Sequence, residues 1–246
     1  MGKLGRQGFI SFGVADLDLA SAFFQNIGFN THGGTHRPDQ VGLFDGSALL
    51  QCRLSDAPDA EFLYFSDRIR DTGRFPGSLP AHTKSEREIS FQSPHGLGVR
   101  IHPRGTDCAE LPPGLTLHRL PIHRILNPAL YPNPICGIFV AFICPVEDIG
   151  ESIAYWERLG FDLLETHQGP YPNVTLSDGV FNIGLHQTRG MEGNGLLYAA
   201  PDMSLRLAHL ETKGMLKIRR NPTKGRKTYD ACIIGPDGIR IYLAGF

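Results

Sequence analysis

The segment VEDIGESIAYWERLGF at residues 146–161 decides the fold, because the segment VADLDLASAFFQNIGF at residues 14–29 repeats its pattern. In each copy the apolar residues recur at every third or fourth position, which predicts a short amphipathic helix. An aspartate stands where each helix would take its N-terminal cap, and a glycine stands where it would take a left-handed C-terminal cap. The chain therefore contains an internal duplication.

The duplication extends beyond these two helices. Each copy leads to an Asp-Gly turn, at residues 45–46 and 178–179, and then to a further strand. A second kind of unit follows, in which FLYF at residues 62–65 corresponds to LLYA at residues 196–199. Four units result, and each is expected to contain one strand, one helix and up to three further strands.

The repeats divide the chain into two halves, which we place at residues 7–102 and 137–246. Residues 103–136 hold seven of the 18 prolines and show no sustained periodicity, so they are expected to form an extended linker. The second unit is degenerate, because the segment between Asp67 and Glu88 is short and rich in Arg, Gly, Pro and Ser. Its helix is expected to be incomplete.

The composition is that of an ordinary globular protein. Of 246 residues, 41% are hydrophobic and 20% are charged, and Lys+Arg 24 against Asp+Glu 25 gives a net charge of -1. This balance lacks the basic excess that binding to nucleic acid or to an anionic membrane needs, and no apolar run is long enough to span a bilayer. The five cysteines are odd in number, widely spaced and without a CxxC pair, which argues against a disulfide framework and fits a reducing cytoplasm.

The repeated pattern resembles the vicinal oxygen chelate superfamily, which holds glyoxalases, bleomycin-resistance proteins and extradiol dioxygenases. The resemblance rests on residues 146–161, 178–187 and 236–243, and more loosely on the matching segments of the first half. It implies an α+β fold with a tandem duplication of paired βαβββ modules. Four modules would form two glyoxalase-like domains, each curled around a cleft.

Most members of that superfamily hold a divalent metal in the cleft, bound by a His or Glu early in a module's first strand and by a Glu in a last strand. In this chain the first-strand position falls on Phe9 and Ala141, which cannot bind a metal. The last-strand positions offer one glutamine, Gln51, and a cation held by neutral ligands alone would be bound loosely. We therefore expect no metal and no other cofactor, with a bound divalent metal ion as the alternative. Over the four modules, the last-strand positions are Gln51, Arg100, Gly184 and Tyr242.

Seven polar side chains are expected to line the cleft, because strand alternation turns them to the face opposite the helices. An imidazole there can act as a base or a ligand, and a guanidinium can receive a carboxylate or a phosphate. The alternative is that they are ordinary residues of exposed strands, and no catalytic residue is assigned. The candidate ligand-binding residues are Gln51, Arg100, His102, Asn182, His186, Arg240 and Tyr242.

Three functions fit the sequence. The first is a glyoxalase-like or bleomycin-resistance-like protein that has lost the metal ligands and binds a small aromatic or hydrophobic organic molecule in a cleft. The second is a metal-dependent lyase, isomerase or dioxygenase of the superfamily, and the third is an interaction module with a vestigial cleft. The sequence does not show whether the protein catalyses a reaction or only binds its ligand. It also does not show which half carries the working cleft.

The expected partner is a small-molecule ligand, and neither a nucleic acid nor a membrane. The basic run at residues 213–227 is expected to form a solvated hairpin, which would attract an anionic group of a ligand. Because one chain supplies four modules, each half can pair its modules internally. A monomer therefore suffices, and a homodimer is compatible with the same arrangement.

Overall fold

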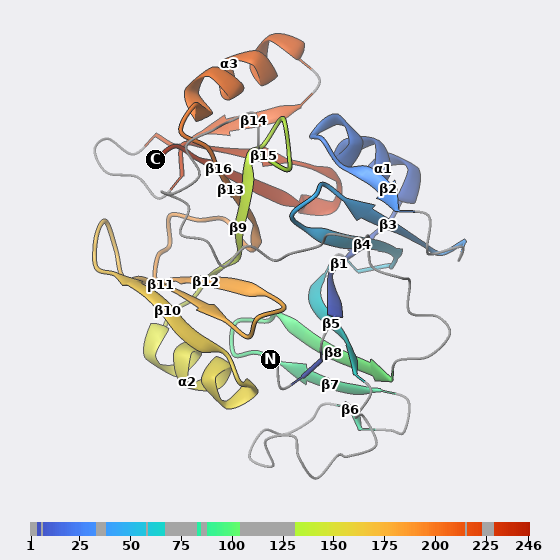
Figure 1. Cartoon of the computed structure of the whole chain (residues 1–246), viewed down its shortest axis with the longest axis vertical. Helices are drawn as coiled ribbons and strands as arrows, with labels where there is room; N and C mark the ends of the chain where they lie inside the picture. Colours follow the sequence, from blue (N-terminus) through green and yellow to red (C-terminus); the bar gives the residue numbers. More distant parts are fainter. Residues whose placement is uncertain are drawn as a thin grey trace.

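The described strands form two eight-stranded mixed sheets, with three α-helices packed against them, which confirms the α+β class (Figure 1). The helix expected in the second module and most of the proline-rich linker lie outside the described residues. In the part of the chain that is described, no helix is long and apolar enough to cross a membrane. The structure is a computed structural model that describes residues 4–5, 7–32, 38–57, 59–66, 83–84, 88–103, 131–214, 216–222 and 229–246.

The first sheet combines the first two modules. Its strand order is β2-β3-β4-β1-β5-β8-β7-β6, with β1 parallel to β4 and antiparallel to β5. The first strands of the two modules therefore lie side by side at the centre. The strands are β1 (Gln7–Val14), β2 (Asn30–His32), β3 (Gln40–Phe44), β4 (Leu49–Leu54), β5 (Ala60–Ser66), β6 (Thr83–Lys84), β7 (Ile89–Gln92) and β8 (Gly98–Pro103).

The second sheet repeats this arrangement with the third and fourth modules. Its order is β10-β11-β12-β9-β13-β16-β15-β14, again with the two first strands at the centre. The matching orders confirm the duplication that the sequence predicts. The strands are β9 (Ile138–Pro145), β10 (Asp162–His167), β11 (Asn173–Ser177), β12 (Asn182–His186), β13 (Gly195–Ala199), β14 (Lys217–Arg220), β15 (Ala231–Ile234) and β16 (Arg240–Ala244).

The helices of the first and third modules form where the repeated segment predicts them. The Asp16 carboxylate accepts a hydrogen bond from the backbone N–H of Leu19 at 2.9 Å, and Asp148 accepts one from Glu151 at 2.9 Å. The third-module helix ends at Gly160, whose φ of 97° suits a residue without a Cβ. The helices are α1 (Leu17–Asn26), α2 (Ile149–Leu159) and α3 (Met203–Lys213), and the single turn η4 spans Pro236–Gly238.

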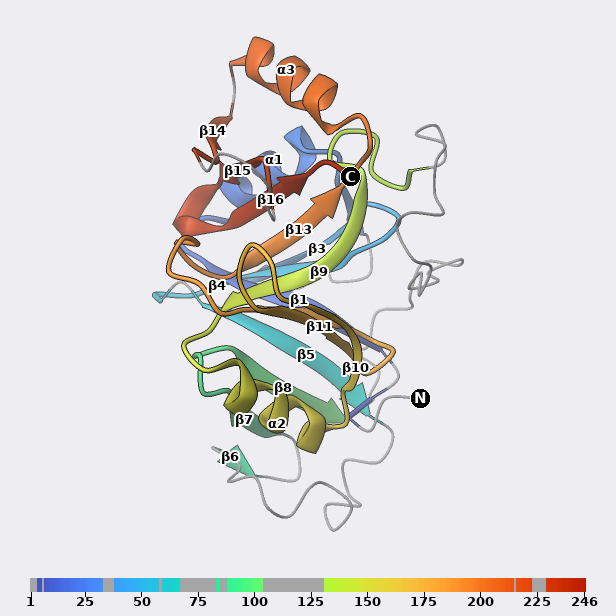
Figure 2. The ribbon, with the colours of Figure 1, turned by 90° about the vertical axis from the view of Figure 1, so that its left-hand side faces the viewer.

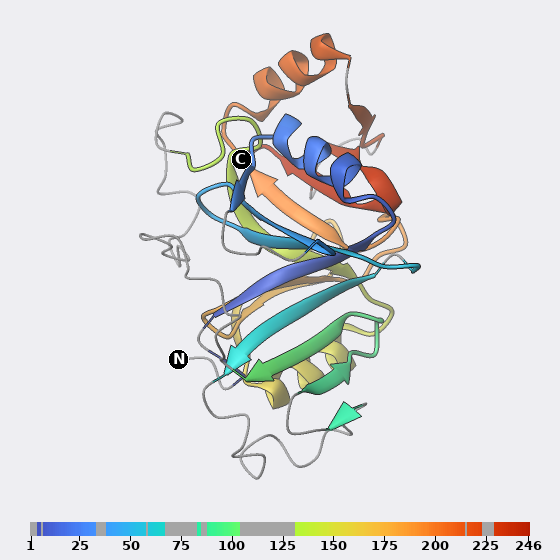
Figure 3. The same ribbon diagram turned by 90° about the vertical axis from the view of Figure 1, so that its right-hand side faces the viewer.

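The two sheets share one core, because α1 and α2 each pack against the other half as well as their own. Figures 2 and 3 show α1 beside the fourth module and α2 beside the second module. Trp156 of α2 is fully buried, and its ring centroid lies 5.7 Å from that of Phe62 in β5. At the other end, the Phe23 ring of α1 lies against Gly235, where a Cβ would come within 2.7 Å of it. One apolar cluster therefore runs through both halves.

Two matched hydrogen bonds also join the halves. The Tyr198 hydroxyl donates to Asp45 at 2.5 Å, and the Tyr64 hydroxyl donates to Asp178 at 2.8 Å. All four side chains are buried, and each carboxylate also accepts backbone N–H groups of its own turn. The aspartates of the two Asp-Gly turns therefore shape the turns and receive a phenol from the opposite half.

Candidate functional site on the cleft faces

Each sheet has a face turned away from the shared core, which we call its cleft face. The side chains that alternate with the core residues along the central strands lie on it. On each sheet the register aligns three such side chains across the two central strands and the neighbouring last strand. The two rows contain positions at which the resemblance implies metal ligands. They are Phe9, Leu63 and Arg100 across β1, β5 and β8, and Ala141, Leu197 and Tyr242 across β9, β13 and β16.

The residues of these rows do not fit a divalent metal ion. Neither row contains a carboxylate or an imidazole, the oxygen and nitrogen ligands that such ions take in proteins. The Tyr242 hydroxyl already donates a hydrogen bond to the carbonyl of Gly193 at 2.7 Å. The side chain of Met191 is buried in an apolar cluster with Ala141 and Ile143. Among the described residues, no group of three or more His, Cys, Asp or Glu is placed to hold a metal ion.

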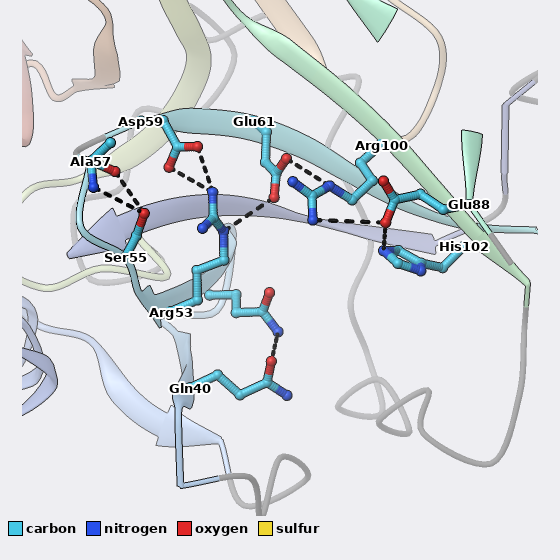
Figure 4. Close-up of polar contacts among 10 residues, drawn as sticks. Gln40, Arg53, Ser55, Ala57, Asp59, Glu61, Glu88, Arg100 and His102 are labelled. Carbon is cyan, nitrogen blue, oxygen red and sulfur yellow. Dashed lines mark hydrogen bonds and ion pairs between the residues drawn. The ribbon is translucent and has the colours of Figure 1, made fainter. Parts of the chain in front are cut away.

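The cleft face of the first sheet carries a chain of ion pairs, drawn in Figure 4. The Glu61 carboxylate is only 6% exposed and lies between two guanidiniums. Its distance to Arg53 Nε is 3.3 Å, and its distance to Arg100 Nε is 3.1 Å. Arg53 also binds both carboxylate oxygens of Asp59, at 2.5 and 2.6 Å. Burial raises the pKa of Glu61, and the two arginines offset part of that rise.

The same chain continues outward through Glu88. This carboxylate lies 3.9 Å from Arg100 Nη1 and 3.7 Å from His102 Nε2. Gln51, the remaining predicted residue on this face, donates a hydrogen bond to the side chain of Gln40 at 3.2 Å. The three predicted residues of the first half therefore lie on the cleft face, and each one contacts a protein partner there.

The cleft face of the second sheet contains a hollow of about 200 Å³ between β14, β15, β16 and the loop at residues 188–194. Its floor includes the rings of Tyr229 and Tyr242, whose centroids lie 4.9 Å apart in an edge-to-face arrangement. Cys232 and Ile234 add an apolar wall. Burial raises the pKa of the Cys232 thiol to about 11, so it stays protonated at neutral pH. Arg219 and Arg240 supply cationic groups at the same hollow.

The loop at residues 188–194 closes one side of this hollow through side-chain contacts. Besides the bond from Tyr242 to Gly193, the Tyr229 hydroxyl donates to the Gly190 carbonyl at 3.4 Å. The Tyr171 hydroxyl donates to the sulfur of Met191 at 3.7 Å. Met191 therefore covers the centre of the second row, and the open space lies beside it, toward β14 and β15.

The guanidiniums around this hollow differ in their partners. Arg219 pairs with Glu192, and Arg220 pairs with Glu211 through two bonds of 2.7 and 2.8 Å. Arg240 donates from Nη1 to the Gly238 carbonyl at 2.8 Å. Its Nε is buried without a hydrogen-bond partner, and no carboxylate in the described part of the chain forms an ion pair with it. One of the three cations is therefore uncompensated.

The last two predicted residues lie on β12, outside the lining of the hollow. Asn182 donates from its side chain to the Val140 carbonyl at 3.1 Å. His186 is not a residue at a solvent-exposed strand edge, because it is only 4% exposed and lies edge-to-face with Tyr171. Its Nδ1 has no partner among the described residues, and burial lowers its pKa to about 4. The imidazole is therefore neutral at physiological pH.

Four residues of these faces were not found by reasoning from the sequence: Glu61, Met191, Tyr229 and Cys232. Glu61 and Cys232 become candidates only through the pairing of strands, which periodicity along one strand does not specify. Met191 and Tyr229 lie outside the strands, so no alternation pattern marks them. For Cys232 this pairing is direct, because it lies opposite Tyr242 across β15 and β16. A correct strand register would therefore have identified it.

No protein-family model matches the sequence, and no curated protein matches it. Solved structures do match. A catechol 2,3-dioxygenase aligns with a TM-score of 0.57 and 13% identity over 100% of this chain and 91% of its own. The Mn(II)-bound glyoxalase from Novosphingobium aromaticivorans aligns with a TM-score of 0.59 and 16% identity, over 100% and 85%. The 2,3-dioxygenase LapB from Pseudomonas sp. KL28 aligns with a TM-score of 0.58 and 16% identity, over 98% and 92%.

The chain thus has the fold of the vicinal oxygen chelate superfamily, as the repeat pattern predicts. The alignments cover both halves, so the tandem arrangement of glyoxalase-like modules is shared and not only a single module. At these identities the likeness concerns the fold, which supports many chemistries.

Proposed function

We propose that the chain binds a small aromatic or hydrophobic organic molecule on the cleft face of the second sheet, without a metal ion. The observation that carries this proposal is the hollow of about 200 Å³ floored by Tyr229 and Tyr242 and walled by Cys232 and Ile234. Ligand sites are typically concave and mostly apolar, with a few polar groups that fix orientation. This hollow has that composition, and its volume suits a molecule of one or two rings.

The first sheet is the weaker candidate. Its hollow of about 150 Å³ is lined by Asp59, Glu61 and Arg100, which bind one another or their neighbours. A ligand there would have to separate ion pairs that are partly buried, which costs several kcal/mol for each desolvated charge. The second sheet offers aromatic surface without that cost.

The proposal that no metal ion is bound rests on the side chains in the row of the second sheet. Ala141 and Leu197 carry no ligand atom, and Tyr242 is hydrogen-bonded to the loop backbone. A glyoxalase or a dioxygenase of like fold would therefore differ from this chain at the centre of the cleft. Sequestration and metal-independent chemistry are both consistent with such a cleft.

The test is a screen of one- and two-ring aromatic fragments by ligand-observed NMR, with Ile234→Trp as the variant. The added indole should fill the hollow and abolish binding of the fragments that bind the unchanged protein. Leu205→Trp is the matched control, because Leu205 is 74% exposed on α3 and does not line the hollow. Binding that survives in Ile234→Trp would overturn the location. One tightly bound Mn²⁺, Fe²⁺, Ni²⁺ or Zn²⁺ per chain in calorimetry would overturn the metal-free part.

A further inference from the structure

We infer that the ligand of the second cleft face is an organic monoanion whose carboxylate lies against Arg240 and whose ring lies against Tyr229 and Tyr242. This inference rests on the proposed function and adds the charge class of the ligand. It is carried by two observations that do not depend on each other. One is the charge balance of the hollow, and the other is the matched position in the first half.

Among the described residues that line the hollow, one positive charge has no carboxylate partner. Arg219 and Arg220 are each neutralised by a glutamate, whereas Arg240 has no carboxylate partner among the described residues. Its Nε is removed from solvent and makes no hydrogen bond. Nη1 bonds the Gly238 carbonyl, but Nε loses hydration without gaining a hydrogen bond, and the guanidinium as a whole has no ion pair among the described residues. An anion in the hollow would supply both. One uncompensated charge matches a ligand with one negative charge.

The pKa values of the hollow point the same way. Arg240 and Arg219 lower the pKa of Cys232, against the larger rise caused by burial, and Arg240 likewise lowers that of Tyr242. Among the described residues, arginines and no carboxylate shift the pKa of these two groups. The potential at Cys232 and Tyr242 therefore favours an anionic guest.

The first half carries a carboxylate at the matched place, where the second half has none. In the first sheet the row contains Leu63 on β5 and Arg100 on β8. Two residues earlier on the same strands, Glu61 lies beside Gly98. The matched residues of the second sheet are Gly195 on β13 and Arg240 on β16. In the first half the Glu61 carboxylate lies between two arginines. In the second half a glycine replaces Glu61, Arg240 takes the place of Gly98, and Tyr242 takes the place of Arg100. This position therefore loses the carboxylate and gains a cation.

The glycine at 195 also brings the strands and the Tyr242 ring close together. A Cβ there would lie 2.9 Å from both the Arg240 Cβ and the Tyr242 ring. Position 195 therefore has no room for a side chain that could supply a carboxylate. A carboxylate bound to Arg240 from the hollow side would form paired, charge-assisted hydrogen bonds with the guanidinium. Its ring would then contact the two phenol rings of the floor.

The experiment compares benzoate with its neutral isostere benzamide by calorimetry and by ligand-observed NMR on the full chain. Benzoate should bind about tenfold more tightly than benzamide, as expected for one additional charge-assisted contact. Arg240→Gln should bring the ratio close to one, and added salt should weaken the binding of benzoate alone. Arg158→Gln, which removes the same charge from the exposed face of α2, should leave the ratio unchanged.

A second variant tests the position without removing the arginine. Ile234 pairs directly with Arg240 across β15 and β16, so Ile234→Glu supplies a carboxylate at the hollow and should abolish benzoate binding. Ile234→Gln has nearly the same shape and no charge, and it should retain most of the binding. Equal loss in both variants would overturn the charge assignment.

The outcomes separate the two proposals. Equal binding of benzoate and benzamide, both lost in Ile234→Trp, would overturn the monoanion and leave the aromatic cleft standing. A benzoate preference that persists in Arg240→Gln would overturn the role of Arg240. Absence of binding by both probes, together with an empty fragment screen, would overturn the proposed function itself.

Discussion

The two cleft faces have the same arrangement of strands but differ in how their charged side chains are paired. On the first sheet, Glu61 lies between Arg53 and Arg100, and every charge in this chain of ion pairs faces an opposite charge (Figure 4). On the second sheet, Arg240 lies beside two tyrosine rings with no carboxylate partner among the described residues. The same scaffold therefore carries paired charges on one cleft face, and on the other an arginine without a carboxylate partner among the described residues.

The faces toward the shared core, unlike the cleft faces, make the same contacts in the two halves. Tyr64 reaches Asp178, and Tyr198 reaches Asp45, through equivalent bonds in opposite directions. Both pairs are buried at the contact between the halves. The core faces therefore make equivalent contacts in the two halves, whereas the cleft faces differ.

The largest expected effect would come from breaking the ion pairs of the first cleft face. Glu61→Gln removes the buried carboxylate that two guanidiniums share, so urea unfolding should show a loss of about 3 kcal/mol in the free energy of unfolding. Arg240→Met, the matched change on the second face, removes a cation that has no ion pair to lose, and it should leave stability nearly unchanged. Equal losses in the two variants would remove the contrast between the faces.

A second effect, smaller for each residue, should appear on acidification and should involve one histidine from each half. Burial lowers the pKa of His95, which lies against Trp156, and of His186 to about 4, below the usual value of 6.5. The unfolded chain therefore binds these protons more readily between pH 6.5 and pH 4, and the free energy of unfolding should fall as the pH falls through that window. Each histidine should contribute about 2 to 3 kcal/mol of this loss by pH 4.5.

Replacing each histidine by leucine isolates its share. His95→Leu and His186→Leu should each flatten the dependence of urea unfolding on pH in that window. The raised pKa values of Glu61 and Asp178 act with the opposite sign, because the folded state binds their protons first. A pH dependence that is unchanged in both variants would contradict the assignment to the two imidazoles.

The smallest effect tests the likeness of the core faces. Tyr64→Phe and Tyr198→Phe each remove one buried hydrogen bond to a carboxylate that keeps its backbone donors. Each should lower the free energy of unfolding by about 1 to 2 kcal/mol, and the two losses should be similar. Thermal unfolding of both variants checks this. A large loss in only one of them would show that the halves contribute unequally at their contact.

Much of the fold could be predicted from the sequence, because its determinants are local. The stripe of apolar residues, the capping aspartates and the Asp-Gly turns specify the helices and hairpins within each module. The parity of strand residues also placed Gln51, Arg100 and Tyr242 on the cleft faces correctly. Those inferences need only the periodicity of a strand or a helix.

Local patterns along the chain therefore specify the duplication, the module pattern and which side chains turn away from the core. The contacts that those side chains make are set by the packing of strands that are distant in the chain. Glu61 meets two arginines because β4, β5 and β8 lie close together, and Arg240 meets none because a glycine stands on the neighbouring strand β13. Electrostatic partners depend on distances between strands far apart in the chain, and no local periodicity encodes those distances.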